Sequence, residues 1–238
     1  MDKKISLKYS VKVLSDTKVT EYLEELKNRI VDNDYTRPLI FIKYGKLNVL
    51  NGLKSIISEI CNCLIIGNMQ AAITLTNHLF ENSLKQTLII WDSQGRQFDN
   101  FKRIDETFKY EVETYDDKDI EPNINNCKRK GLITKDEAKR LIELKNIYRN
   151  SFSHASYKKL FKDASAVIYS GSLKDLTEVK EEITDISKVP FLYLLGQEQF
   201  AKYNALNYFL EIYEFIDKMD NKLLDLYPET KEFVLHNS

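Results

Sequence analysis

From residue 47 onward, apolar residues recur at helical spacing over stretches too long for strands, and this pattern constrains the fold most. The first such stripe comprises Leu50, Leu53, Ile56, Ile57, Ile60 and Leu64. Comparable stripes run through residues 70–91, 135–154 and 197–227. Amphipathic helices of this kind bury their apolar faces against one another. The sequence therefore predicts a mainly α protein built as an antiparallel helical bundle, extending over residues 45–238.

Residues 1–44 have a different character. Apolar residues alternate with polar ones over residues 4–13, which is typical of a half-buried strand. A helix that Ser15 or Asp16 would cap comes next, and the apolar run 39–42 after Pro38 predicts a second strand. We therefore expect residues 1–44 to form a β-α-β-like appendage.

A charged insert, residues 156–190, interrupts the bundle before its last helix. Within it, the apolar run 166–169 predicts another strand. This strand either pairs with the N-terminal strands or belongs to a mobile flap. We expect a small peripheral β element, contributed by the N-terminus and by this insert.

Composition narrows the choice of ligands. The net charge of −1 over 238 residues gives no global cationic field, so an anionic ligand would need a local basic patch. No stretch approaches the ~20 apolar residues that span a bilayer, and no hydrophobic signal segment follows the charged N-terminus. Three cysteines argue against a disulfide framework, and Cys61 and Cys63 lack a second ligand pair nearby. We expect a cytoplasmic protein with no metal, no cofactor and no membrane partner.

The segment from residue 134 to residue 154 carries the candidate chemistry. Thr134 and Glu137 have the spacing of a capping box, which predicts the start of a helix. On that helix the polar side chains of Arg149, Asn150, Ser153 and His154 share an arc of roughly 140°. The opposite arc holds the apolar residues Leu141, Leu144, Tyr148, Phe152 and Ala155. A fixed cation and a titratable imidazole on one face suit phosphate chemistry without a metal.

This helix resembles the signature helix of the HEPN superfamily. The family pattern is an arginine, usually a polar residue next, and a histidine after four to six intervening positions. Here Asn150 follows Arg149, and four residues separate Arg149 from His154. An upstream helix over residues 71–85 is similar to the first bundle helix of these proteins, which often carries an acidic residue near its middle. Glu81 occupies that position.

The resemblance implies a metal-independent endoribonuclease that cleaves RNA by attack of the ribose 2′-OH and leaves a 2′,3′-cyclic phosphate. It also implies a bacterial antiviral defence or toxin-like role. His154 would act as general base or general acid, because its pKa lies near the working pH. Arg149 would stabilise charge on the scissile phosphate, and Asn150 would orient His154 or a phosphate oxygen.

Active members of the family commonly work as dimers. One chain supplies one histidine of this kind, and acid–base cleavage is easier with two. We therefore expect a homodimer with its site at the two-fold interface, and an antitoxin or sensor protein is a further candidate partner.

Other interpretations stay open for several of these residues. Arg149 is a candidate for a structural ion pair with Glu81 or with Glu143, either of which would also orient its guanidinium. Asn150 is a candidate for an interhelical hydrogen bond, and Ser153 for a role in orienting the site. The rival function is a non-catalytic helical module that binds RNA, a nucleotide or a partner protein.

A short basic run and one tyrosine complete the candidate site. Lys128, Arg129 and Lys130 precede the signature helix, where they either contact an RNA backbone or form a solvated surface. Tyr157 is a candidate for stacking on a base. Tyr148 is predicted to face the core, so we expect it to pack.

Overall fold

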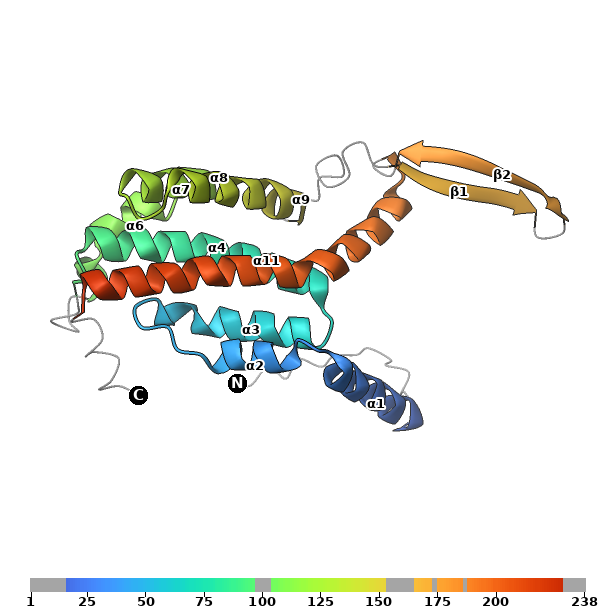
Figure 1. Ribbon diagram of the computed structural model, residues 1–238, viewed down its shortest axis with the longest axis horizontal. Helices are drawn as coiled ribbons and strands as arrows, with labels where there is room; N and C mark the ends of the chain where they lie inside the picture. The colour runs from blue at the N-terminus through green and yellow to red at the C-terminus, as the bar shows by residue number, and fades with distance from the viewer. Residues whose placement is uncertain (1–15, 97–103, 153–164, 173–174, 186–187, 229–238) are drawn as a thin grey trace, which may run out of the picture.

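The computed structural model describes residues 16–96, 104–152, 165–172, 175–185 and 188–228, and over these residues the protein is mainly helical (Figure 1). The helices of the first half are α1 (Asp16–Asp32), α2 (Thr36–Tyr44), the 3-10 turn η1 (Asn51–Leu53), α3 (Lys54–Ile65) and α4 (Met69–Asp92). The second half contains α5 (Ile104–Thr107), α6 (Lys109–Tyr115), α7 (Ile120–Arg129), α8 (Lys135–Leu144), the π-helical turn η3 (Lys145–Arg149), α9 (Asn150–Phe152), β1 (Ser165–Ser172), β2 (Asp175–Asp185) and α11 (Pro190–Leu226). The long helices predicted from the apolar stripes are therefore present.

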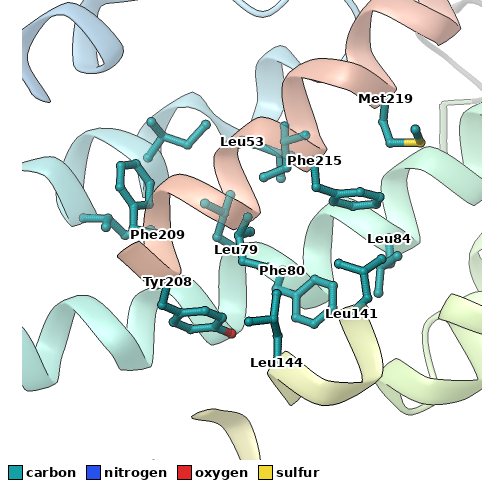
Figure 2. Packing of buried hydrophobic residues seen from close by; sticks show 14 of the residues in the cluster. Leu53, Leu79, Phe80, Leu84, Leu141, Leu144, Tyr208, Phe209, Phe215 and Met219 are labelled. Atoms are coloured by element: carbon teal, nitrogen blue, oxygen red, sulfur yellow. The ribbon is translucent and has the colours of Figure 1, made fainter. Parts of the chain in front are cut away.

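Two long helices, α4 and α11, form the centre of the molecule (Figure 1). Their facing residues are fully buried, and the ring of Phe80 meets that of Phe215 edge-on at 6.5 Å between centroids. Helix α3 covers one side of this pair, and α8 contributes Leu141 and Leu144 from the other side (Figure 2). The apolar arc predicted for the signature helix thus faces the core.

Helix directions differ in part from an all-antiparallel arrangement. Helix α8 runs antiparallel to α11, because Glu137 and Arg140 contact Lys218 and Glu211 in reverse order. In contrast, α4 and α11 run parallel. Tyr208 bonds to Asn77 near the start of their contact, and Tyr227 bonds to Trp91 near its end. Helix α8 leads the chain away from the Asp92 end of α4, where Lys130 bonds to Asp92, toward Glu81 in the middle of α4, which Arg149 contacts.

The N-terminal region shows one wrong prediction. Residues 39–42, expected as a strand, lie in helix α2. Pro38 is the third residue of that helix, where a missing backbone N–H costs nothing because the first turn has no intrahelical acceptor for it. Leu39 is buried while Ile40 and Phe41 are exposed, so the apolar run is not a buried strand. The strand predicted over residues 4–13 lies outside the described residues.

The insert contains a β-hairpin. The predicted strand over residues 166–169 is confirmed as part of β1, which pairs antiparallel with β2 in the register Val167 opposite Ile183. The partner strand thus comes from the insert itself, since β2 follows β1 directly. The hairpin lies beyond the first turns of α11, away from the helical core (Figure 1).

No helix in the described part of the chain is long and apolar enough to cross a membrane.

Candidate functional site

The helix that carries the site begins at the predicted capping box. The backbone N–H of Thr134 donates to Glu137 Oε2 at 2.7 Å, and the backbone N–H of Glu137 donates to Thr134 Oγ1 at 3.2 Å. Two backbone donors that a helix start leaves unpaired are thereby satisfied. The capping box fixes where α8 starts.

A π turn interrupts this helix before the site. Residues 145–149 form a π-helical turn, and the N–H of Asn150 donates to the carbonyl of Lys145 five residues earlier. The sequence predicted one regular α-helix through this region, so the structure differs here. Single π turns are frequent at functional sites.

Tyr148 anchors the π turn to the core. Its ring stacks on that of Tyr208 from α11, with centroids 3.9 Å apart and planes 8° apart. The Tyr208 hydroxyl in turn donates to Asn77 Oδ1 on α4 at 2.8 Å. Tyr148 therefore packs as predicted, and the turn is held against both central helices.

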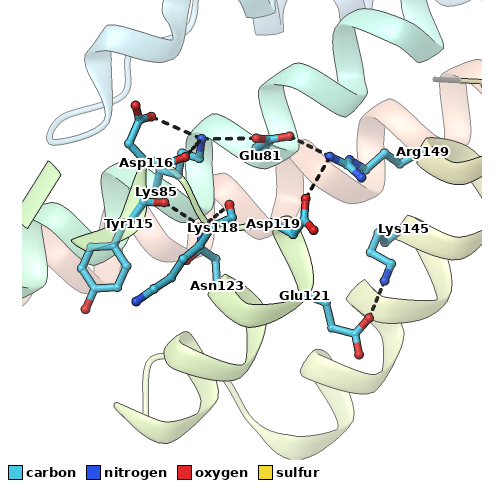
Figure 3. Close-up of polar contacts among 10 residues, drawn as sticks. All are labelled: Glu81, Lys85, Tyr115, Asp116, Lys118, Asp119, Glu121, Asn123, Lys145 and Arg149. Atoms are coloured by element: carbon cyan, nitrogen blue, oxygen red, sulfur yellow. Dashed lines mark hydrogen bonds and ion pairs between the residues drawn. The ribbon is translucent and has the colours of Figure 1, made fainter. Parts of the chain in front are cut away.

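Arg149 follows Tyr148 and points toward two carboxylates (Figure 3). Its Nη2 lies 3.6 Å from Glu81 Oε2 on α4 and 3.7 Å from Asp119 Oδ1, just before α7. Glu81 also lies 3.2 Å from Lys85 Nζ. Of the two predicted partners of Arg149, Glu81 is confirmed.

The alternative partner, Glu143, is wrong. Its carboxylate lies 3.3 Å from Arg140 Nη1, one turn earlier on the same helix. Arg140 also forms a bidentate pair with Glu211 of α11, with Nε 2.5 Å from Oε1 and Nη2 2.9 Å from Oε2. The hydrogen bonds that Arg140 donates to Glu211 are the main reason that the pKa of Arg140 is raised above its ordinary value. Glu143 therefore belongs to the α8–α11 contact.

Asp119 was not predicted as a site residue. It occupies the N-cap position of α7 but makes no side-chain capping bond, and its carboxylate is turned toward Arg149. An aspartate at the start of a helix ordinarily has a capping role, so its residue type gave no signal for a contact with Arg149. Only the packing of α7 against the signature helix gives Asp119 a different partner.

A second ion pair lies beside the first. Lys145 on the π turn bonds to Glu121 in the first turn of α7 (Figure 3). Both pairs line a groove of about 550 Å³ between α7 and the π turn. The groove is lined by Asp119, Ile120, Glu121, Pro122, Asn125, Lys145, Arg149 and Asn150. Lys145 and Glu121 are also site residues that sequence reasoning missed.

Asn150 lines the groove as well, but its side-chain hydrogen bond is local. Its Nδ2 donates to Asn146 Oδ1 at 3.1 Å, within the same helical segment. The hydrogen bond that Asn150 Nδ2 donates is therefore not the interhelical bond considered from the sequence. Three further predicted site residues, Ser153, His154 and Tyr157, lie outside the described residues.

The predicted basic run lies away from the groove. Arg149 meets the first turn of α7, whereas Lys128 and Arg129 lie in its last turn, and α7 is about 15 Å long at ten residues. Lys130 Nζ is 2.5 Å from Asp92 Oδ1, and Arg129 donates to Asn126 Oδ1 at 2.9 Å. The structure thus does not bring residues 128–130 together with Arg149.

The described residues were searched for a metal site and for a reactive cysteine. Among those residues, no group of three or more His, Cys, Asp or Glu side chains could hold a metal ion. Burial raises the pKa of the Cys61 thiol to about 11 and that of Cys127 to about 12. Both thiols therefore stay protonated at neutral pH and are poor nucleophiles.

A larger hollow of about 690 Å³ lies between the end of α1, the α3–α4 turn and α11. Its charged lining residues are Arg29, Glu198 and Lys202, and Arg29 Nη2 is bonded to Glu25 at 2.6 Å. We take the Arg149 groove as the candidate site because its charged side chains pair across it, Arg149 with Asp119 and Lys145 with Glu121, and because it contains the predicted residues Arg149 and Asn150.

The described residues thus define a mainly helical protein with a polar groove at the start of α7. Comparisons with protein-family models, with curated proteins and with solved structures find no match for this chain.

Proposed function

We propose that this protein is a HEPN-type, metal-independent endoribonuclease, a helical bundle that acts in bacterial defence or in a toxin-like role. The observation that carries the proposal is the placement of Arg149 in a groove, oriented by Glu81, five residues before His154 in the sequence. A guanidinium can bind two phosphate oxygens at once and stays charged at any working pH.

The proposed reaction is a transesterification. The ribose 2′-oxygen attacks the adjacent phosphorus, the bond from phosphorus to the 5′-oxygen breaks, and the products are a 2′,3′-cyclic phosphate and a 5′-hydroxyl. Arg149 stabilises the charge that develops on the phosphate oxygens. His154 removes the 2′-OH proton or protonates the leaving 5′-oxygen, and a second copy of the chain supplies the other histidine. DNA is inert because it lacks the 2′-OH.

Glu81 supports this chemistry as a positioning residue. It is only partly exposed, and Lys85 on the same helix neutralises part of its charge. Glu81 can therefore hold the Arg149 side chain in the groove without fully neutralising the positive charge of its guanidinium.

The test is RNA cleavage in the presence of EDTA, comparing the wild type with His154→Ala and Arg149→Ala. Each substitution should lower the rate by about 10²-fold or more, since each removes a transition-state interaction. Arg140→Ala is the matched control, because Arg140 is an ion-paired arginine of the same helix that lies outside the groove. Equal rates in all four proteins, or a wild type that cleaves no RNA substrate, would refute the nuclease proposal.

A second candidate is a non-catalytic helical module that binds RNA, a nucleotide or a partner protein. One observation favours it: the charged residues lining the groove are Asp119, Glu121, Lys145 and Arg149, so positive and negative charges balance. RNA binding without cleavage in the same experiment would support this module.

A further inference from the structure

Two cations lie next to each other on the π turn. Lys145 and Arg149 are four residues apart, roughly 6 Å along a helix axis, and both line the groove. Their side chains are mostly buried, at 14% and 21% exposed. Both charged groups are therefore held in place by the surrounding helices.

Each cation meets one carboxylate from the start of α7. Asp119 lies 3.7 Å from Arg149, and Glu121 bonds to Lys145. These carboxylates are far more exposed than the cations, at 82% and 47%. Solvent-exposed carboxylates contribute little to ion pairs and are readily replaced by another anion.

We propose that Lys145 is a second phosphate-binding residue, and that single-stranded RNA contacts Lys145 and Arg149 through neighbouring phosphates. In the absence of RNA, Glu121 and Asp119 occupy the positions of these phosphates. The inference rests on the proposed function for the identity of the ligand.

The size of the groove favours a single strand over a duplex. A volume of about 550 Å³ lies in the range that holds one drug-sized molecule, which corresponds to one or two nucleotides. Lys145 contacts a phosphate as a point charge, so it contributes affinity without reading the base.

The experiment measures binding of a fluorescein-labelled single-stranded RNA by anisotropy at several salt concentrations. All proteins carry His154→Ala, so that the RNA stays intact. Adding Lys145→Ala should weaken binding about tenfold and reduce the slope of log affinity against log salt by about 0.7, the value for one phosphate contact on a single strand. Lys139→Ala is the matched control, because Lys139 is an exposed lysine of α8 outside the groove.

Glu121→Gln tests the proposed displacement. The amide cannot neutralise Lys145, so RNA should bind several-fold more tightly, whereas Glu143→Gln should leave binding unchanged. A purely structural Lys145–Glu121 pair predicts no tightening for Glu121→Gln and an unaltered salt slope for Lys145→Ala. Either of those results overturns the inference. Circular dichroism checks that each variant is folded. If Lys145→Ala does not fold, Lys145→Arg replaces it: this variant keeps the charge, so the salt slope of its RNA binding should equal that of the parent protein, and a lower slope overturns the inference.

Failure of this inference is distinguishable from failure of the proposed function. A wild type that cleaves RNA, with binding indifferent to Lys145, leaves the nuclease standing and removes the second phosphate position. RNA binding that depends on Lys145, in a wild type that does not cleave, keeps the phosphate position and removes the nuclease.

Discussion

At the scale of single residues, Asp220 is a buried charge that several hydrogen bonds satisfy. It lies on α11, is 1% exposed, and accepts hydrogen bonds from the backbone N–H groups of Asn48, Val49 and Leu50, each at 2.7 Å. The Asn48 side chain adds a fourth bond at 3.2 Å. One carboxylate therefore ties the chain segment before η1 to the central helix.

Replacing Asp220 by Asn should lower the free energy of unfolding by about 2–4 kcal/mol. The amide keeps the shape but loses the charge, and its NH₂ group faces backbone donors that then lack an acceptor. Urea unfolding followed by circular dichroism measures the change. Asp225→Asn, on the exposed side of the same helix, should change stability by less than about 0.5 kcal/mol. Similar values for the two variants would show that the bonds to Asp220 contribute little.

Single residues also show where sequence reasoning ends. Glu81 was expected from the family resemblance, and its contact with Arg149 is present. Asp119 and Glu121 became partners of the π-turn cations only through packing of α7, which no periodic pattern specifies. Tyr203 lies in the apolar stretch 197–227 yet is 72% exposed, whereas Ala201 and Ala205 beside it are fully buried, so Tyr203 lies on the solvent side of α11.

At the scale of helices and strands, the capping box was a reliable signal, whereas short apolar runs gave mixed results, since the run 166–169 is a strand and the run 39–42 is helical. The capping box at Thr134 depends on four consecutive residues, so the sequence alone located the start of α8. The four-residue apolar run at 39–42 carries no period that separates strand from helix, and the structure makes it helical. The π turn has no sequence signal that we recognise.

The capping box predicts a pH-dependent stability for α8. Partial burial would raise the pKa of Glu137, but hydrogen bonds from Lys218 and Thr134 outweigh it and hold that pKa below its ordinary value of 4.5. The ionised form is thus favoured more in the folded than in the unfolded state. Its stabilisation is complete above pH 4.5 and is lost as the pH falls through the lower, folded-state pKa.

Glu137→Gln should therefore destabilise the protein by about 1 kcal/mol at pH 7, and the difference from the wild type should shrink as the pH falls below 4.5. Thermal or urea unfolding across pH 3–7 gives the comparison, with the exposed Glu214→Gln on α11 as control. A difference that stays constant over this range would mean that the charge of Glu137 has no stabilising role.

At the scale of the whole molecule, the sequence specified helices but not their neighbours. Apolar stripes predicted the long helices α3, α4, α8 and α11, because each stripe is a property of its own segment. The parallel alignment of α4 with α11 depends on how long connections fold back, and stripes carry no such information. For the same reason the groove between α7 and the π turn could not be located beforehand.

The proposed homodimer gives a prediction at this scale. If two chains share one site, excess His154→Ala protein should lower the activity per wild-type chain, because most wild-type chains then pair with an inactive partner. Purified mixtures of fixed wild-type content, equilibrated to allow subunit exchange, are assayed for RNA cleavage. Excess Arg140→Ala protein, which keeps the groove residues, is the control and should not lower it. If excess His154→Ala protein leaves the activity per wild-type chain unchanged, each chain contains a complete site and the shared-site proposal is wrong.

The π turn lets this helix hold one extra residue without turning the residues that follow it. The N–H of Asn150 bonds to the carbonyl of Lys145 five residues earlier, and with one residue fewer between Lys145 and Arg149 the same two groups would form the ordinary α-helical bond over four residues. Arg149 would then still face Glu81 and Asp119. A related chain that lacks one residue between Leu144 and the arginine would therefore present the arginine–asparagine–histidine motif on the same face of the bundle, so a one-residue gap at this point is no sign of a different function.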